Sequence, residues 1–189
     1  LAILRDGWRA EGDRWPEIVH NMQNRIGISS GQMVTGNMGS ESRMNYTMMG
    51  DNVNTAARLE SSAKQYGIYI QIADSTYQPV KDKVIVRDLD NVRVLGKEEP
   101  VKVWELISEI GQEPEPYKKT LPAYNEALNL YKNQEWNKAI EAFKASDALE
   151  DMFAGRKTNP SRIYVPRCEH FIDNPPGDNW DGVWTLTSK

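Results

Sequence analysis

The sequence is poor in the residues that build disulfide frameworks and metal clusters. It contains one cysteine, Cys168, and two histidines, His20 and His170, in 189 residues. A single cysteine excludes an intrachain disulfide and a zinc cluster built on cysteine. The two histidines are far apart in the sequence and have no other obvious ligands beside them. We interpret both as surface or packing residues rather than metal ligands.

The sequence also lacks a long apolar run and an excess of positive charge. No stretch approaches the ~20 apolar residues of a membrane-spanning helix, and no signal peptide opens the chain. We therefore expect a soluble, cytoplasmic chain. The net charge of −4 gives no sign of the basic surface that binds nucleic acid, so we expect no nucleic-acid partner.

Apolar residues recur at helical spacing over the first 24 residues. We predict a helix here, broken near Gly12 and Pro16. Because the pattern is already helical at Leu1, we expect the chain to be part of a longer protein. The sequence does not reveal whether that protein has an upstream sensor or a membrane domain.

The region that follows alternates between strand and loop patterns. Short strands are predicted over 26–29, 32–35 and 46–49. Gly36, Gly39 and Ser40 predict a loop between the second and the third of these. Later strands are predicted over 68–72 and 84–86, and a hairpin over 92–95 and 101–107. Together with the helices, these strands indicate an α/β fold.

A helix is predicted after Gly50, with Asp51 or Asn52 as its N-cap. Asn54 and Arg58 stand four residues apart on it, so both side chains lie on one face, where an amide and a guanidinium can meet a single anionic group. Taken alone, the pair also fits the solvated face of an amphipathic helix. The apolar stripe is expected at Val53, Ala56, Ala57 and Ala63.

The sequence changes character after about residue 110. Residues 111–122 are predicted to be a linker, because Pro114, Pro116 and Pro122 interrupt any regular element. Two amphipathic helices are predicted over 123–132 and 136–143, and the residues to 189 are expected to form a turn-rich tail. The apolar spacing of this helix pair resembles one tetratricopeptide repeat. A lone repeat cannot bury its own face, so we expect it to pack on the first domain or on a partner.

Four segments, in order, resemble the class III nucleotidyl cyclases. They are residues 25–40, 45–60, 68–70 and 92–106. The resemblance implies that residues 1–110 are the C-terminal portion of a cyclase domain. The implied fold is an α+β sandwich with a ferredoxin-like palm, incomplete at its N-terminus and followed by a small helical extension.

The resemblance implies an adenylyl cyclase of bacterial type, which converts ATP to cyclic AMP and pyrophosphate. In this reaction the ribose 3′-oxygen attacks the α-phosphorus, and charge builds on the phosphoryl oxygens. The family roles assign ribose orientation to Asn54 and stabilisation of the transition-state charge to Arg58. We expect this chain by itself to be inactive.

Three further residues are implied to bind the substrate. Thr47 occupies the base-reading position and favours adenine, although the residue is equally a β-branched residue in a strand. Arg43 resembles the arginine that reaches the phosphates from the opposite subunit. The family's triphosphate-binding lysine is replaced by Leu95, and Lys97 is the nearest substitute.

The family shares its active site between two subunits, which implies a head-to-tail homodimer with two equivalent sites. Two Mg²⁺ or Mn²⁺ ions are implied, with aspartate ligands expected upstream of Leu1, so we assign no metal ligand within this chain. Three alternatives stay open: a guanylyl cyclase, a catalytically degenerate cyclase-like regulatory domain, and an interaction module centred on the helix pair.

Overall fold

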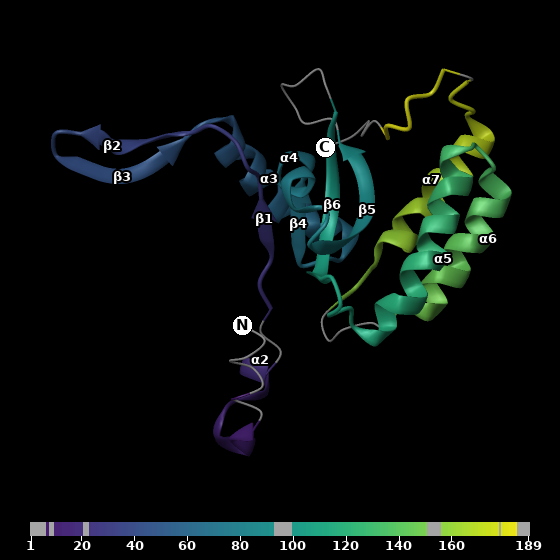
Figure 1. The fold of residues 1–189 in the computed structure, drawn as a ribbon, viewed down its shortest axis with the longest axis horizontal. Coiled ribbons are helices and arrows are strands. Elements are labelled where there is room, and N and C mark those ends of the chain that lie inside the picture. The colour runs from purple at the N-terminus through teal and green to yellow at the C-terminus, as the bar shows by residue number, and fades with distance from the viewer. Residues whose placement is uncertain are drawn as a thin grey trace.

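A four-stranded sheet, a projecting β-hairpin and a group of C-terminal helices make up the protein (Figure 1). The structure is a computed structural model, and it describes residues 7, 10–20, 23–92, 100–150, 156–177 and 179–184. The hairpin extends from one side of the sheet, and the helices α5, α6 and α7 lie on the opposite side. This mixed architecture confirms the predicted α/β class.

The sheet has the strand order β1-β4-β6-β5. Its strands are β1 (Ile26–Ile28), β4 (Ile70–Ala73), β5 (Val84–Val92) and β6 (Val101–Glu109). β1 and β4 are parallel, while β4 with β6 and β5 with β6 are antiparallel. Parallel neighbours need a crossover connection. The chain between them supplies it through the helix α3 (Asp51–Tyr66). The predicted hairpin is confirmed only in part, because its second strand, 101–107, is β6, whereas its first strand, 92–95, shares only Val92 with β5 and residues 93–99 lie outside the described residues. The segment 84–86, predicted as a separate strand, is the start of β5.

Helix α3 packs closely on β1. A Cβ atom at Gly27 would lie 2.1 Å from the carbonyl oxygen of Ala56, so only glycine allows the helix to approach this strand. The buried face of α3 consists of Thr55, Leu59, Ala63 and Tyr66. Of the predicted stripe, Ala63 is buried, Val53 and Ala56 are half-buried, and Ala57 is exposed, because the tertiary contact with β1 selects a face that includes a threonine and a tyrosine.

The predicted loop around Gly36 and Gly39 is part of a β-hairpin. Strand β2 (Val34–Ser40) pairs antiparallel with β3 (Arg43–Met49) in continuous register. Every residue of β3 is exposed. The prediction failed because glycines weaken a strand without preventing pairing, and seven consecutive backbone pairs outweigh that cost here.

The predicted linker is mostly helical. Helix α5 (Glu115–Lys132) begins directly after Pro114 and contains Pro122. Pro116 lies in the first turn, where the missing N–H costs nothing because these donors have no helical partner. Treating every proline as an interruption was therefore wrong. The second predicted helix is confirmed as α6 (Trp136–Leu149).

A third helix, α7 (Pro160–Asp173), occupies the predicted turn-rich tail. The Asn159 side chain accepts a hydrogen bond of 3.1 Å from the backbone N–H of Arg162, which caps the helix start. Pro160 follows at the first helical position. The tail prediction was wrong because Pro166 and the flanking turn residues concealed the helix. α7 packs on α6 and gives the helix pair the neighbour that a lone repeat requires.

The core of this helical unit is largely aromatic. The ring of Tyr131 lies 4.7 Å from that of Tyr164, 5.2 Å from that of Trp180 and 5.3 Å from that of Trp136. Trp184 packs at the edge of the same cluster. Edge-to-face contacts of this kind add to the stabilisation that comes from burial alone.

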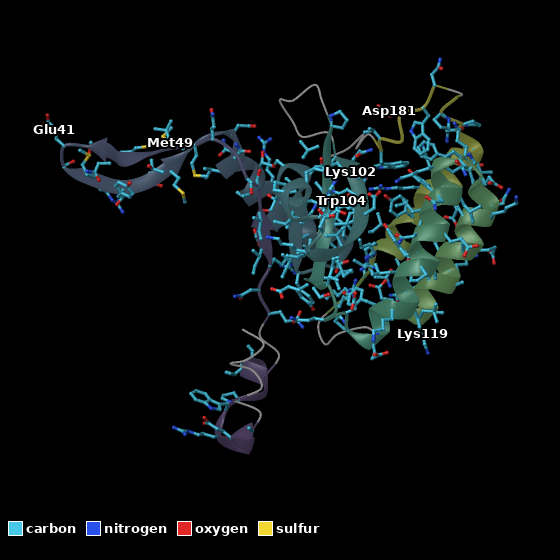
Figure 2. The ribbon with its side chains drawn as sticks, in the orientation of Figure 1. Glu41, Met49, Lys102, Trp104, Lys119 and Asp181 are labelled. Atoms are coloured by element: carbon cyan, nitrogen blue, oxygen red, sulfur yellow. The ribbon has the colours of Figure 1, made fainter. Side chains whose placement is uncertain are left out.

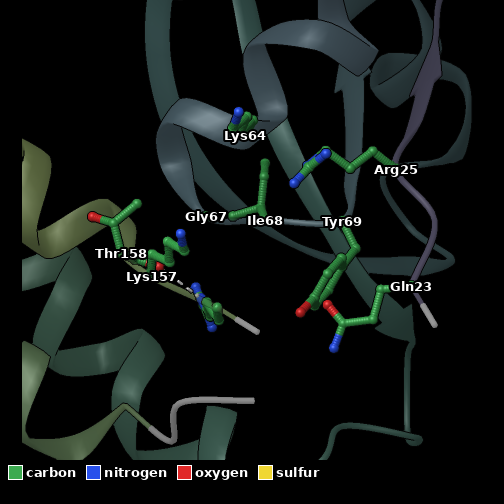
Figure 3. A pocket seen from close by; sticks show the side chains of 9 residues that line it. Gln23, Arg25, Lys64, Gly67, Ile68, Tyr69, Lys157 and Thr158 are labelled. Carbon is green, nitrogen blue, oxygen red and sulfur yellow. Dashed lines mark hydrogen bonds between the residues drawn. The ribbon is translucent and has the colours of Figure 1, made fainter. Parts of the chain in front are cut away.

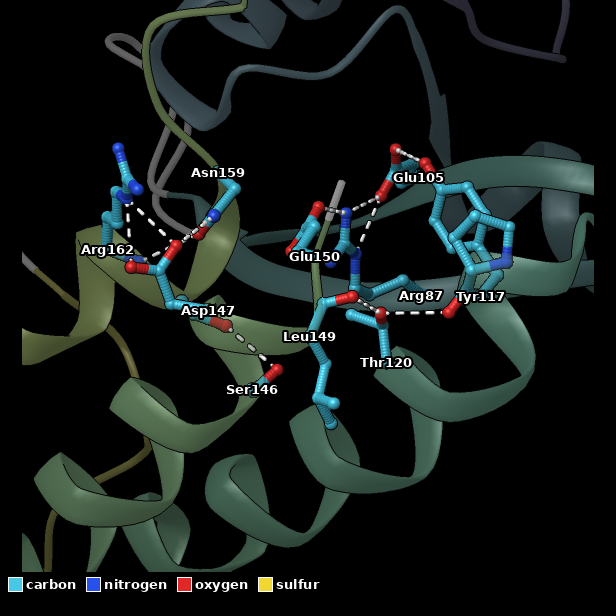
Figure 4. A network of polar contacts seen from close by, with 12 residues as sticks. Arg87, Glu105, Tyr117, Thr120, Ser146, Asp147, Leu149, Glu150, Asn159 and Arg162 are labelled. Carbon is cyan, nitrogen blue, oxygen red and sulfur yellow. Dashed lines mark hydrogen bonds and ion pairs between the residues drawn. The ribbon is translucent and has the colours of Figure 1, made fainter. Parts of the chain in front are cut away.

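A buried ion-pair network joins the sheet to the helical unit (Figure 4). Arg87 on β5 contacts Glu105 on β6 at 2.5 Å and donates to both carboxylate oxygens of Glu150 at 2.9 and 3.0 Å. Arg156 contacts Glu150 at 2.5 Å. Burial acts to lower the pKa of Arg87, but the two glutamates raise it above its usual value. Two arginines and two glutamates thus balance their charges inside the protein.

The chain before β1 contains only short helical segments among its described residues. These are the 3₁₀ turn η1 (Gly12–Arg14) and the helix α2 (Glu17–His20). They agree with a helix broken near Gly12 and Pro16, while residues 1–6, 8–9 and 21–22 lie outside the description. Two further short elements, α4 (Asp74–Tyr77) and η2 (Gln78–Val80), follow β4. Among the helices that the structure describes, none has both the length and the apolar character that a membrane crossing requires.

Candidate active site

Asn54 and Arg58 lie in the first two turns of α3. Both side chains are exposed, and their spacing places them one turn apart on a face that flanks the buried one. The predicted juxtaposition is therefore present. The N-cap is Gly50 and makes no side-chain cap hydrogen bond, so the expected cap by Asp51 or Asn52 was wrong. Asp51 is the first helical residue, where its negative charge suits the positive end of the helix dipole.

Asn52 has a positioning role that the sequence did not reveal. Its side-chain oxygen accepts a hydrogen bond of 3.2 Å from the Ser29 hydroxyl, and its amide nitrogen donates one of 3.1 Å to the carbonyl oxygen of Gln32. These bonds tie the first turn of α3 to the loop between β1 and β2. The contact thus adds to the packing on β1 in holding the part of the helix that carries Asn54 and Arg58.

Thr47 lies on β3, opposite Gly36 in the hairpin register, and is exposed. It stands two residues before the end of the strand at Met49, a distance of about 7 Å along an extended chain. Because Gly50 and α3 follow at once, Thr47 lies near the helix that carries Asn54 and Arg58. The structure thus brings the base-reading candidate and the catalytic candidates to the same end of the hairpin.

Arg43 lies at the other end of β3, next to the turn. Figure 2 shows Glu41 at the far end of the projecting hairpin and Met49 nearer to the sheet. Six residues of strand separate Arg43 from Met49, which corresponds to about 20 Å. Within one chain, the structure therefore does not bring Arg43 to Asn54 and Arg58.

Two further predictions concern the triphosphate-binding lysine and the metal ligands. Lys97 and Leu95 lie outside the described residues, so the lysine's role stays a prediction. Within the described ranges, no group of three or more histidine, cysteine, aspartate or glutamate side chains is arranged to hold a metal ion. That the metal ligands lie upstream of Leu1 stays a prediction.

Comparison with known proteins decides the family. Residues 11–108 match the family model of the adenylate and guanylate cyclase catalytic domain. The chain belongs to this family. Its members are lyases that make cyclic nucleotides, and they generally depend on divalent metal ions. The matched residues include the four described candidates for the site, Asn54, Arg58, Thr47 and Arg43.

Individual relatives extend the comparison. The terminal-differentiation-specific adenylate cyclase of Dictyostelium discoideum is 31% identical over 152 residues, which cover 78% of this chain and 7% of that protein. An adenylate cyclase of Anabaena cylindrica is 38% identical over 84 residues, 43% of this chain and 17% of that protein. The crystal structure of the adenylyl cyclase CyaB from P. aeruginosa is 32% identical with a TM-score of 0.45, covering 60% of this chain and 54% of that one. The chain thus spans less than a fifth of the length of these two curated relatives.

Proposed function

We propose that the protein containing this chain is an adenylyl cyclase that converts ATP to cyclic AMP and pyrophosphate. The observation that carries the proposal is the exposed pair of Asn54 and Arg58 in the first turns of α3, within a chain of the cyclase family. The names of the relatives in Dictyostelium and Anabaena support adenine as the base. We propose that the reaction takes place in the cytoplasm.

In the proposed reaction, Asn54 and Arg58 act on different parts of the nucleotide. The neutral amide of Asn54 holds the ribose so that its 3′-oxygen is aligned with the α-phosphorus. The Arg58 guanidinium donates to the phosphoryl oxygens, where charge grows as the bond to pyrophosphate breaks. Thr47 contacts the edge of the purine through its hydroxyl, and Lys97 is proposed to contact the triphosphate.

The active form is proposed to be a homodimer in which each site uses residues of both chains. The support comes from the hairpin of β2 and β3. Its exposed apolar side chains include Val34, Met44, Tyr46, Met48 and Met49, with between 53% and 75% of each accessible to solvent. An apolar ribbon of this kind is typical of an interaction surface. A second chain covering it would receive Arg43 near its own Asn54 and Arg58.

The metal requirement is proposed to be two Mg²⁺ or Mn²⁺ ions, with ligands N-terminal to Leu1. When bound, such ions neutralise the phosphates and activate the attacking hydroxyl. Because the described residues supply no metal centre, the roles assigned to this chain are limited to holding the ribose, the base and the phosphoryl oxygens.

The test is an assay of the purified full-length protein with ATP and with GTP, each in the presence of Mg²⁺ or Mn²⁺. We expect cyclic AMP with ATP and a much lower rate with GTP. A preference for GTP would replace the proposal by a guanylyl cyclase. No turnover with either nucleotide, in a protein that still binds ATP, would indicate a degenerate cyclase-like domain, in line with Leu95 at the lysine position.

A further inference from the structure

A second concave site lies at the opposite end of α3 from Asn54 and Arg58. It has a volume of about 170 Å³ and lies between the start of β1, the last turn of α3 and the segment that leads into α7 (Figure 3). Four cationic side chains line it: Arg25, Lys64, Arg156 and Lys157. They come from three separate parts of the chain, and no carboxylate is among the lining residues that the structure describes.

The four cations of the pocket differ in their partners. Arg156 forms an ion pair of 2.5 Å with Glu150, and its Nε donates a hydrogen bond of 3.1 Å to the carbonyl oxygen of Thr158. Arg25, Lys64 and Lys157 have no ion-pair partner among the residues that the structure describes. Cations elsewhere in the chain do have partners, among them Lys102, Lys132 and Arg162. Gathering three like charges in one concavity is unfavourable unless an anion offsets them.

The pocket is a built junction rather than a loose surface hollow. Gly67 has a φ of +65°, and a Cβ atom there would lie 1.9 Å from the carbonyl oxygen of Thr158. The segment before α7 therefore rests directly on the end of α3. The last carbonyl oxygens of α3 accept hydrogen bonds from Gly67 and Ile68, at 3.2 and 3.1 Å. These carbonyl groups at the C-terminal end of the helix therefore have hydrogen-bond donors. The positive charge of Lys64 in the last turn also offsets the negative end of the helix dipole.

We propose that this pocket binds a small phosphate-bearing anion, in the size range of inorganic phosphate to pyrophosphate. A volume of about 170 Å³ holds roughly six water molecules, which is the space that such an anion occupies. Arg25 offers a planar fork to phosphate oxygens, and the two lysines act as point charges. Since Arg25 and Lys64 belong to the cyclase part and Lys157 to the helical unit, the bound anion would connect the two. The proposal does not rest on the proposed function, because Asn54 and Arg58 take no part in it.

Isothermal titration of the 189-residue chain tests this site, with inorganic phosphate and inorganic pyrophosphate as separate probes. Low ionic strength and a chelator keep metal-dependent nucleotide binding out of the measurement. We expect saturable binding of at least one probe to a single site. Lys64→Ala and Arg25→Ala should each weaken it about tenfold, and Lys64→Arg should retain it. The tighter probe identifies whether the site fits one phosphate group or two.

Two control variants make the assignment specific. Lys119→Ala removes an exposed lysine of α5 outside the pocket, and Arg58→Ala removes the guanidinium of the candidate active site. Lys119→Ala should bind the probes as the unchanged chain does, and Arg58→Ala should retain the binding that depends on Lys64. The proposal is overturned if neither probe binds saturably, if Lys119→Ala weakens binding as much as Lys64→Ala, or if Arg58→Ala abolishes binding that Lys64→Ala leaves intact.

Discussion

The hydroxyl of Tyr66 donates a hydrogen bond of 2.7 Å to Oδ2 of Asp90. The same carboxylate oxygen lies 2.7 Å from Nη1 of Arg167 on α7. Burial, together with the negative charge of Asp90, raises the pKa of the Tyr66 hydroxyl above its usual value, so the phenol stays a donor. The last turn of α3, the strand β5 and the helix α7 thus meet at one buried carboxylate.

This meeting point predicts a modest but measurable effect of Tyr66→Phe. The change deletes one hydrogen bond to a charged group and leaves the ion pair of Asp90 and Arg167 in place. The free energy of unfolding should fall by about 1.5 kcal/mol, measured by urea denaturation. Tyr46→Phe is the matched control. Because Tyr46 is 75% exposed, loss of its hydroxyl should leave the free energy of unfolding unchanged. Equal stability of the two variants would show that the Tyr66 bond contributes no net stability.

A larger loss is expected when the charge balance around Arg87 is broken. Glu150→Gln leaves two buried arginines with one carboxylate between them, so the free energy of unfolding should fall by about 3 kcal/mol or more. Glu141→Gln serves as the control, because Glu141 pairs with Lys144 on the exposed surface of α6 and should cost less than about 0.5 kcal/mol. Comparable losses in the two variants would contradict the role of the buried network.

The proposed role of Arg58 predicts a specific kinetic pattern in the full-length protein. Arg58→Ala should lower kcat about a hundredfold, equivalent to ~3 kcal/mol of lost transition-state stabilisation, with little change in KM. Steady-state assays with ATP measure both parameters. If KM rises while kcat stays within a few-fold, Arg58 contacts the bound substrate rather than the transition state.

The assignment of Thr47 to the base predicts a change in selectivity rather than in folding. Thr47→Val keeps the β-branched shape in β3 and removes one hydroxyl, so the hairpin should form unchanged. The rate with ATP should fall by the equivalent of ~1 to 2 kcal/mol, and the preference for ATP over GTP should narrow by a similar factor. Unchanged rates with both nucleotides would leave Thr47 with a structural role only.

Alkaline pH should destabilise the protein through its buried acids. Burial raises the pKa of the Cys168 thiol from 9.0 to about 12. The unfolded chain releases this proton above about pH 9, whereas the folded protein retains it until about pH 12. The protonated thiol therefore makes its full contribution to the free energy of unfolding below pH 9. That contribution is lost as the pH rises from about 9 to about 12. Burial also raises the pKa values of Tyr124 and Tyr164, which adds to the loss above pH 10.

Two measurements check this pH dependence. Urea midpoints between pH 8 and pH 10.5 should fall, and Cys168→Ala should make the fall smaller. At pH 8 the folded protein should leave Cys168 unreactive toward a thiol reagent, and denaturant should expose it. Rapid modification of the folded protein would contradict the burial of this thiol.

Local patterns in the sequence were sufficient to predict the parts of the fold that depend on neighbouring residues. The helix α3, with Asn54 and Arg58 on one exposed face, follows from their spacing after Gly50. The strand β6 likewise follows from the apolar segment 101–107, whereas the polar middle of β5 hid the continuous strand from Val84 to Val92. The buried face of α3 was missed, because contact with β1 at Gly27 decides which side of the helix is covered.

Other features depend on partners that are remote in the sequence. Arg87 finds Glu150 63 residues later, and no local pattern marks either residue as buried. Pro166 concealed the helix α7, and Pro122 concealed the first turns of α5, whose remainder was predicted. The bridge made by Asn52 depends on a loop more than 20 residues earlier, so its role becomes visible only once the chain is folded.

The aromatic cluster of the helical unit gives the protein an internal optical probe. Trp136, Trp180 and Trp184 all belong to this unit, whereas Trp104 on β6 lies in the sheet, with its ring 4.4 Å from that of Tyr77. Three of the six tryptophans therefore lie in the helical unit, so tryptophan emission reports in large part on the helices, while far-ultraviolet circular dichroism reports on helices and sheet together. If the buried arginines hold the two parts as one cooperative structure, the two signals will change at the same denaturant concentration. Separate transitions would show that the helices can melt while the sheet persists.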